Sequence, residues 1–435
     1  MKNLKLIIIS IFVLFVVSLI TAQENSPLIK SKYIKEIKKL AEQPKIKAAF
    51  KIIDELEKNT QENLIFLTEI PAPPFNEDKR AEAFAKLLKN AGADRVFTDK
   101  VGNVIAELKG SSKKTVLIEG HLDTVFPIGT DVTVKMRGDT LFAPGIGDDT
   151  RGLALIITLL RAINDAKIRT NATIYFAGTV GEEGLGDLRG VKYLFNSEDI
   201  NIDSYIAVDG GGLNRVVTSA VGSHRYRVTF KGPGGHSWGA FGLVNPHHAL
   251  GRAIEYFTNT ADQYSRTKGP KVSYNVGRIG GGTSVNSIPF ESWMEVDMRS
   301  SNPKRLLKMD DLFQNAMQKA LNDQNDLGRT NAKMIVDIKM VGNRPAGKVD
   351  QNDPLVQRTM ASISYLGGIP KLGSGSTNSN IPFSRNIPAV TIGRGGSGKH
   401  GHSLNEWWLN EDGDLSIKNA LLILVSQAGG LNNQK

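Results

Sequence analysis

Cysteine is absent from this 435-residue sequence. The absence excludes disulfide bonds as a source of stability, and it excludes lipid attachment through an N-terminal cysteine. Any metal ion must therefore be bound by histidine, aspartate or glutamate, and the chain has only seven histidines. Internal repeats and low-complexity tracts are also missing. With 40% apolar and 23% charged residues, the composition is that of a folded protein and excludes disordered and fibrous classes.

Long apolar runs are rare, with one exception at the N-terminus. Residues 1–22 contain Lys2 and Lys5, then a mostly apolar run over residues 6–20, and end at Ala22. This pattern is typical of a secretory signal peptide cleaved after Ala22, so we expect a secreted or periplasmic protein with no stable membrane anchor after cleavage. The run is about 15 residues long, which is short for a membrane span. An uncleaved anchor is the alternative.

Acidic residues are fewer than basic residues, 44 against 54, so the formal net charge is +10. Such an excess can attract anionic surfaces or acidic substrates. Much of it lies in residues 30–51, where apolar residues recur at helical spacing among lysines and indicate a peripheral amphipathic helix. No nucleic-acid motif and no interleaving of aromatic and basic residues accompany it, so we do not expect nucleic-acid binding.

The order of elements indicates two domains, one inserted into the other. Helical patterns over residues 48–66 and 77–91 are followed by alternating strands and helices. Residues 218–346 then have the order strand, helix, two strands, helix, strand, which is that of a split βαβ module with its own core. We predict an α/β catalytic domain formed by residues 23–217 and 347–435, and an inserted domain formed by residues 218–346.

Several predicted strands are followed by acidic residues beside glycine. Open α/β sheets bind ligands at the carboxyl ends of their strands. A histidine and an aspartate two positions apart suit a metal ligand with a carboxylate that fixes the tautomer of the imidazole. The repetition favours a functional site over chance. The strand 115–118 is followed by His121 and Asp123, the strand 172–179 by Glu182 and Glu183, and the strand 205–208 by Asp209.

Seven short motifs follow one another along the chain. They are HLDT at His121, GDDTRG around Asp148, GEEG at Glu182, VDGG at Asp209, GGHS at His236, NSIP at Asn286 and HSLNEW at His402. Together they resemble the two-metal exopeptidases that include glutamate carboxypeptidase, peptidase T (tripeptide aminopeptidase), carnosinase-like dipeptidases and aminoacylase (metallopeptidase family 20). The resemblance runs from about residue 69 to the C-terminus. It implies an α/β fold with a phosphorylase/hydrolase-like three-layer catalytic domain and an inserted ferredoxin-like α+β domain, which serves as lid and dimer interface.

The resemblance also implies a two-metal centre. His121 and Asp209 would bind one ion, Glu183 and His402 the other, and Asp148 would bridge them. Nitrogen and oxygen ligands without thiolate suit zinc first, with cobalt or manganese as alternatives. Two such ions can share a hydroxide, which supplies a nucleophile at neutral pH while the ions polarise the scissile carbonyl.

Two acidic residues that are not ligands have implied roles beside the metals. Asp123 would orient His121. Glu182 would be the general base, because a carboxylate that is not committed to a metal can take the proton of the attacking water and pass it to the leaving amine.

The inserted domain carries three further residues with implied roles. His236 would polarise the substrate carbonyl in the site of the neighbouring chain, so we expect a homodimer. Asn286 and Arg299 would hold a free carboxylate of the substrate, a task that suits the planar fork of arginine. The family more often has aspartate where Asn378 stands, and for this reason we leave that position out of the site.

The sequence therefore predicts a secreted two-metal exopeptidase that hydrolyses short peptides. An amidohydrolase that removes acyl groups from amino acids would use the same site and is the alternative. A non-catalytic binding homologue is less favoured, because such proteins usually lose ligands or the base, and here the five ligands and Glu182 are all present.

Overall fold

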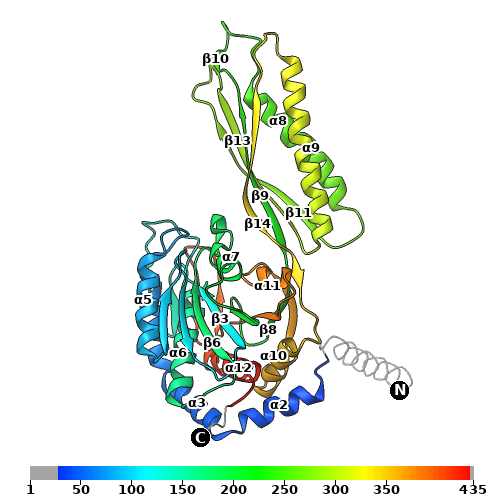
Figure 1. The fold of residues 1–435 in the computed structure, drawn as a ribbon. Coiled ribbons are helices and arrows are strands. Elements are labelled where there is room, and N and C mark those ends of the chain that lie inside the picture. The colour runs from blue at the N-terminus through cyan, green and yellow to red at the C-terminus, as the bar shows by residue number, and fades with distance from the viewer. Residues whose placement is uncertain (1–27, 432–435) are drawn as a thin grey trace, which may run out of the picture.

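The computed structural model describes residues 28–431, so the signal peptide predicted at residues 1–22 lies outside the described part. Figure 1 shows a lower domain built around a central sheet, and an elongated domain that extends away from it. Within residues 28–431, no helix has the length and apolar character that crossing a membrane requires.

A nine-stranded mixed sheet forms the centre of the catalytic domain. Its strands are β1 (Arg95–Thr98), β2 (Val104–Leu108), β3 (Thr115–His121), β6 (Thr173–Thr179), β7 (Ser204–Val208), β8 (Arg215–Ala220), β15 (Gly347–Lys348), β16 (Lys371–Gly375) and β17 (Ala389–Ile392). They lie in the order β1-β2-β6-β3-β7-β17-β8-β15, and β16 pairs with β8. Strands β6, β3, β7 and β17 are parallel, so their carboxyl ends meet at one edge.

Helices cover both faces of this sheet. They are α2 (Ser31–Ala41), α3 (Pro44–Glu55), α4 (Glu57–Thr68), α5 (Asp78–Asn90), α6 (Thr150–Asp165), α7 (Arg189–Asn196), α10 (Pro354–Tyr365), α11 (Asn380–Ser384) and α12 (Gly413–Gln427), with a short 3-10 helix, η1 (Gly184–Gly186). In β3, Val116 and Ile118 belong to the core shared with α5, α6 and α12, whereas Leu117 belongs to the core shared with α7 and α11. The predicted three-layer α/β architecture is confirmed.

The N-terminal helices differ from the prediction. The helix expected over residues 30–51 is interrupted before Pro44, because the residue that precedes a proline is forced out of the helical region, and Gln43 is extended. The helix expected over residues 48–66 is two helices, since α3 ends at Glu55 and α4 begins at Glu57. The change of direction lets α3 pack on both α6 and α12, while α4 packs on α6.

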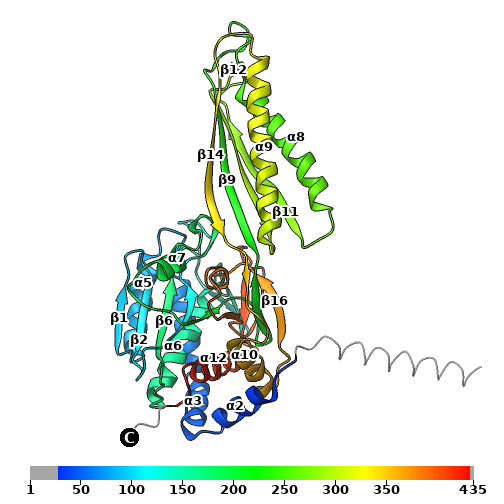
Figure 2. The ribbon, with the colours of Figure 1, turned by 45° about the vertical axis from the view of Figure 1, so that its right-hand side comes forward.

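The inserted domain has the predicted order of elements. These are β9 (Gly222–Lys231), α8 (Pro246–Ser265), β11 (Val272–Gly281), β13 (Glu291–Ser300), α9 (Pro303–Leu327) and β14 (Ile335–Arg344). The four strands form an antiparallel sheet in the order β11-β13-β9-β14, and α8 and α9 pack on one face of it. Its separate core includes Phe257 and Phe313, whose rings meet edge to face with centroids 5.3 Å apart. Figure 2 shows that this domain projects from the catalytic domain, with its tip away from it.

The boundary of the inserted domain differs by a few residues from the predicted 218–346. Thr218 lies inside β8, which belongs to the sheet of the catalytic domain. The chain leaves that sheet after Ala220 and returns to it at Gly347, the first residue of β15. Two short crossings therefore connect the domains.

Two small sheets have no counterpart in the sequence prediction. One joins β10 (Gly235–His236) to β12 (Ser287–Ile288) at the far end of the inserted domain, which we call the tip. The other joins β4 (Lys135–Arg137), β5 (Thr140–Phe142), β18 (Ser397–Lys399) and β19 (Trp407–Leu409). Strands of two or three residues are too short to show a period in the sequence.

Candidate active site

His121 is the last residue of β3, at the edge where the parallel strands end. The strand is buried throughout and carries the imidazole into the protein, where only 2% of His121 is exposed. Gly120 permits a close approach behind it, because a Cβ atom there would lie 2.7 Å from a carboxylate oxygen of Asp149. That same oxygen accepts a hydrogen bond of 3.1 Å from the His121 backbone N–H.

The His121 ring is oriented by Asp123, through a different atom from the one expected. Nδ1 lies 2.9 Å from the backbone carbonyl oxygen of Asp123, and 3.8 Å from its carboxylate. A carbonyl can only accept, so Nδ1 carries a proton, and Nε2 is directed into the site toward Asp148. The Asp123 carboxylate instead accepts hydrogen bonds from the backbone N–H groups of Glu182 and Glu183, at 2.9 and 2.7 Å. It therefore fixes the turn that carries the two glutamates.

Asp148 lies between two imidazoles. One carboxylate oxygen is 3.3 Å from Nε2 of His121, and the other is 3.1 Å from Nε2 of His402. Burial alone would raise the pKa of Asp148, but hydrogen bonds with His121 and His402 outweigh it and hold this pKa well below its usual value. The carboxylate is thus ionised, with one oxygen facing each histidine, which is the arrangement required of a bridging ligand.

The remaining predicted ligands complete two groups that share Asp148. In each group the candidate ligand atoms lie within 4.8 Å of one another. Glu183 also approaches His402 directly, with Oε1 2.8 Å from Nε2. This donor set fits two divalent cations. The first group is His121, Asp148 and Asp209, and the second is Asp148, Glu183 and His402. A third candidate group, His121, Glu182 and Glu183, does not include Asp148.

Glu406 joins the loop of His402 to the loop of Asp148. Its buried carboxylate accepts hydrogen bonds from the backbone N–H groups of Gly145, Gly147 and Asp148, at 2.8 to 3.0 Å. Two candidate ligands that are distant in sequence, Asp148 and His402, therefore lie in loops that one side chain joins.

Glu182 lies beside the two groups and is bound by an arginine. Its Oε1 accepts a hydrogen bond of 2.9 Å from Nη1 of Arg344, and its backbone carbonyl accepts another from Nη2. Burial raises the pKa of Glu182 to about 8, against the opposing influence of the Arg344 charge. Glu182 is thus a buried carboxylate that is paired with Arg344.

Several residues of this region were not predicted. Arg344, Arg225 and Arg215 line the cleft of about 340 Å³ in which the metal-ligand candidates lie. Arg225 donates to the backbone carbonyl of Gly184 at 2.6 Å, just beyond the two glutamates. Arg215 begins β8, Arg225 lies in β9 and Arg344 ends β14. None of them belongs to a motif, so the general excess of basic residues was the only signal in the sequence.

The residues predicted in the inserted domain do not all lie together. Arg299 is near the end of β13 closest to the catalytic domain, and it lines the same cleft. His236 and Asn286 are at the tip, where the Ser237 N–H donates to the Asn286 carbonyl at 2.9 Å. A strand of ten residues spans about 30 Å, and β13 separates the two ends. Within one chain, Asn286 and Arg299 therefore cannot bind the same carboxylate.

Asn378 is buried behind the site. Its side-chain amide donates to Glu119 at 3.0 Å and to Thr179 at 2.8 Å, and both of these residues belong to the central strands β3 and β6. Asn378 thus supports the sheet next to the ligands and does not line the cleft.

The comparisons with known proteins identify the family of the chain. A sequence profile described as peptidase family M20/M25/M40 matches residues 117–422. Carboxypeptidase G2 of Pseudomonas is 24% identical over 329 residues, which cover 72% of this chain and 75% of that protein.

Two solved structures share the fold. A tripeptidase of Staphylococcus aureus superposes with a TM-score of 0.69 and 21% identity, covering 86% of this chain and 99% of that one. The Bacillus subtilis YXEP protein, described as a dinuclear metal-binding peptidase of family M20, superposes with a TM-score of 0.60 and 17% identity, covering 86% and 99%. The family predicted from the motifs is confirmed: the chain belongs to peptidase family M20/M25/M40 and is a metal-dependent hydrolase of peptide or amide bonds.

Proposed function

We propose that the protein is a secreted or periplasmic exopeptidase that hydrolyses short peptides. It would use two divalent cations, and zinc is the metal that we propose first. The observation that carries this proposal is the position of Asp148, whose two carboxylate oxygens face His121 and His402 at 3.3 and 3.1 Å. Cations held there would polarise the scissile carbonyl and acidify the attacking water. Cobalt or manganese would suit the same ligands.

Glu182 is the residue best suited to move the proton. It is buried, and it belongs to neither of the two groups that share Asp148, although it forms a third candidate group with His121 and Glu183. Burial raises its pKa to about 8, so its carboxylate is a stronger base than that of an exposed glutamate. It would take the proton of the water and deliver it to the leaving amine. Arg344 holds the carboxylate in place during both transfers.

Arg299 is the candidate for binding a free carboxylate of the substrate. It lines the cleft beside the ligands, and its Nε is paired with Asp297 at 2.7 Å, which leaves the terminal nitrogens of the fork available. A substrate anchored there would present the peptide bond next to its terminal carboxylate to the metals. This geometry favours release of a C-terminal residue.

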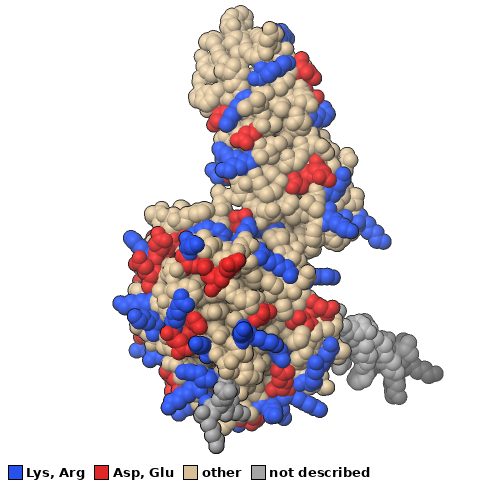
Figure 3. Space-filling model, viewed as in Figure 1, with Lys and Arg blue, Asp and Glu red and all other residues tan. Residues whose placement is uncertain are grey.

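A dimer would bring His236 and Asn286 to a metal centre. The tip that carries them is far from the cleft of its own chain, and large apolar side chains are exposed on it, with Trp238 87% and Val285 103% exposed. Figure 3 shows few charged side chains at this end of the molecule. In a twofold dimer, the tip of each chain could enter the cleft of its partner.

The test is a substrate panel on purified protein, with matched variants. We expect hydrolysis of di- and tripeptides with a free C-terminus, and a fall in kcat of about 10²–10⁴ in Glu182→Gln with two metal ions still bound. The exposed Glu62→Gln is the control. Preferential cleavage of N-acyl amino acids would favour the deacylase, and binding without any turnover would favour a non-catalytic homologue. Undiminished turnover in Glu182→Gln would refute the assignment of the base.

A further inference from the structure

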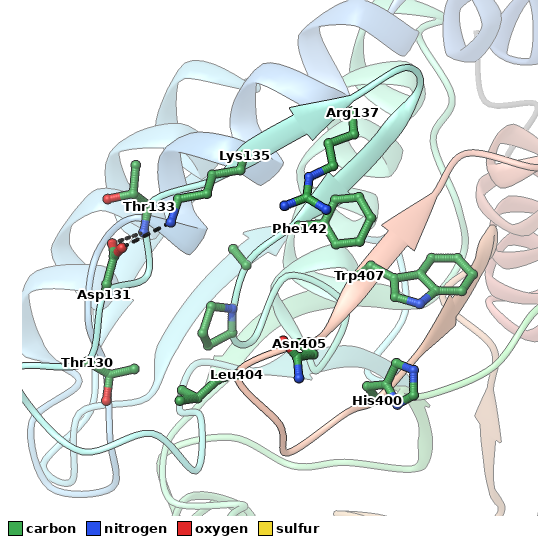
Figure 4. Close-up of a pocket in the computed structure, with 12 residues that line it drawn as sticks. Thr130, Asp131, Thr133, Lys135, Arg137, Phe142, His400, Leu404, Asn405 and Trp407 are labelled. Carbon is green, nitrogen blue, oxygen red and sulfur yellow. Dashed lines mark hydrogen bonds and ion pairs between the residues drawn. The ribbon is translucent and has the colours of Figure 1, made fainter.

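A second hollow lies beside the metal cleft. It has a volume of about 800 Å³ and is lined by side chains from segments 130–137, 142–144 and 400–407, and we call it the rim pocket. Figure 4 shows that these side chains come from the small β4-β5-β19 sheet and from the loops that precede β4 and β19. The rim pocket exceeds the metal cleft in volume, and both lie within the range of small-molecule binding sites.

One loop contributes to both hollows. His400 lines the rim pocket and His402, two residues later, lines the metal cleft. Two residues of chain span at most about 7 Å. Glu406 ties this loop to the Asp148 turn, so the wall between the hollows is held by buried hydrogen bonds.

The rim pocket combines cationic and aromatic groups. The guanidinium of Arg137 lies 5.1 Å from the ring centroid of Phe142. Among residues 28–431, Arg137 has no carboxylate within ion-pairing distance. Lys135 is paired with Asp131 at 3.4 Å, but both side chains are about two-thirds exposed, so this pair is weak and easily exchanged. Trp407 adds a second, half-buried ring.

We propose that the rim pocket binds the acyl side of substrates longer than a dipeptide, and that it selects a carboxylate next to an aromatic residue in that part of the chain. The proposal rests on the proposed function, in which Arg299 holds the C-terminal carboxylate and the acyl side extends away from it. A dipeptide spans about 7 Å, so it fits entirely within the metal cleft and does not reach the rim pocket. Residues further from the scissile bond pass the His400–His402 loop and meet Arg137, Lys135 and the rings.

The test compares substrates that differ only in the acyl portion. All substrates end in the same C-terminal residue, one that the wild type releases. The acyl portion that precedes this residue is N-acetyl-Ala, N-acetyl-Tyr-Glu-Ala or N-acetyl-Tyr-Gln-Ala. We expect the Glu substrate to have the highest kcat/KM. In Lys135→Ala/Arg137→Ala, the ratio of kcat/KM for the Glu substrate to that for the short one should fall about tenfold, the effect of losing a hydrogen-bonded charge.

Lys113→Ala is the matched control, because Lys113 is exposed and precedes β3 at the opposite edge of the sheet. Three results would overturn the proposal. The ratio of kcat/KM for the Glu substrate to that for the short substrate could be the same in the double variant as in the wild type, or the wild type could have equal kcat/KM for the Glu and Gln substrates. The third is that Lys113→Ala lowers the ratio as much as the double variant does.

Calorimetry with N-acetyl-Tyr-Glu-Ala-amide separates this proposal from the proposed function, because it requires neither cleavage nor a terminal carboxylate. The rim pocket predicts binding by the wild type and at least tenfold weaker binding by Arg137→Ala. If no peptide is cleaved but this difference is found, the proposed function fails and the rim pocket stands. If binding is equal in both proteins, the rim pocket is refuted whatever the activity.

Discussion

Arg344 donates a hydrogen bond of 2.9 Å to the carboxylate of Glu182, and both side chains are buried. The two residues come from different domains, since Arg344 ends β14 of the inserted domain. Arg344 also donates to the Ser376 hydroxyl at 3.0 Å, which fixes the direction of its fork. The proposed base therefore takes its position from the strand that joins the domains.

Replacing Arg344 should shift the pH dependence of catalysis. The Arg344 charge lowers the pKa of Glu182 against the effect of burial, so Arg344→Met should raise that pKa above its wild-type value. The ionised fraction at neutral pH then falls about tenfold for each unit, and the acid limb of kcat against pH moves to higher pH. Arg344→Lys, which keeps a cation, should recover much of the shift. A profile that falls in height without moving would show that Arg344 is only structural.

Metal content should depend unequally on the ligands. Asp148 belongs to both groups of candidates, whereas Asp209 and His402 each belong to one. Elemental analysis should therefore find about two ions per chain in the wild type, loss of both in Asp148→Ala, and loss of one in His402→Ala. Chelation should abolish hydrolysis and lower the Tm, because a bound ligand stabilises the folded state. Two ions in dialysed Asp148→Ala would contradict the bridging role.

Arg299→Ala should weaken the binding of substrates that carry a free carboxylate. We expect kcat/KM to fall by an amount equivalent to about 2–5 kcal/mol, the range for a desolvated charge pair. The control is Arg278→Ala, an exposed arginine of the same sheet that is paired with Glu295. Wild type should also cleave C-terminally amidated peptides poorly. Equal rates on free and amidated peptides would assign recognition to the amino end instead.

Mixed dimers should test whether the tip acts on the partner chain. His236→Ala and Glu182→Ala chains, each inactive as homodimers, should recover activity after subunit exchange, because one site of each heterodimer carries neither lesion. Random exchange predicts roughly a quarter of wild-type activity by the same symmetry. Failure to recover, with exchange proven by mass-tagged chains, would assign His236 to its own chain or to no catalytic role.

Asp310 should make the inserted domain sensitive to acid. Burial alone would raise the pKa of Asp310, but hydrogen bonds from His224, Tyr226 and Gln314 outweigh it and hold this pKa below its ordinary value. The resulting stabilisation is present above the pKa of the unfolded chain and is lost as pH falls through the folded value. Asp310→Asn should therefore lower the Tm at pH 7, and the gap to wild type should narrow below about pH 4. A gap that is independent of pH would contradict this origin.

Three of the five metal-ligand candidates follow an apolar strand and lie near glycine, whereas Asp148 and His402 were predicted from the family resemblance alone. His121 ends β3 and Asp209 directly follows the adjacent parallel strand β7, so the sheet brings these two together, whereas Glu183 lies on the turn after β6 that Asp123 fixes. The role of Asp123 was less accessible, because the sequence does not reveal whether a carbonyl or a carboxylate reaches the ring. Its carboxylate proved to bind the backbone of the Glu182 turn.

Other features depend on contacts that leave no local pattern. Arg344 meets Glu182 across 162 residues, and nothing near Arg344 in the sequence indicates a buried ion pair. Arg299 lies at the end of β13 near the catalytic domain, and Asn286 lies at the tip, before the other end of that strand. These positions follow from the strand pairing and not from the spacing of the two residues. The rim pocket could not be predicted from the sequence, because it is built on strands of three residues, which show no period.

The inserted domain extends from the crossings to the tip as one elongated unit. Strands β9 and β14 each run for ten residues from the crossings toward the tip, and they are paired along their length, so they bend little. With an arm of about 30 Å, a rotation of 10° at the crossings would displace the tip by about 5 Å. Because only the segments after Ala220 and after Arg344 cross between the domains, such a rotation would leave the nine-stranded sheet intact. A small rotation at the crossings, where Arg344 lies, would thus produce a larger displacement of His236 at the tip.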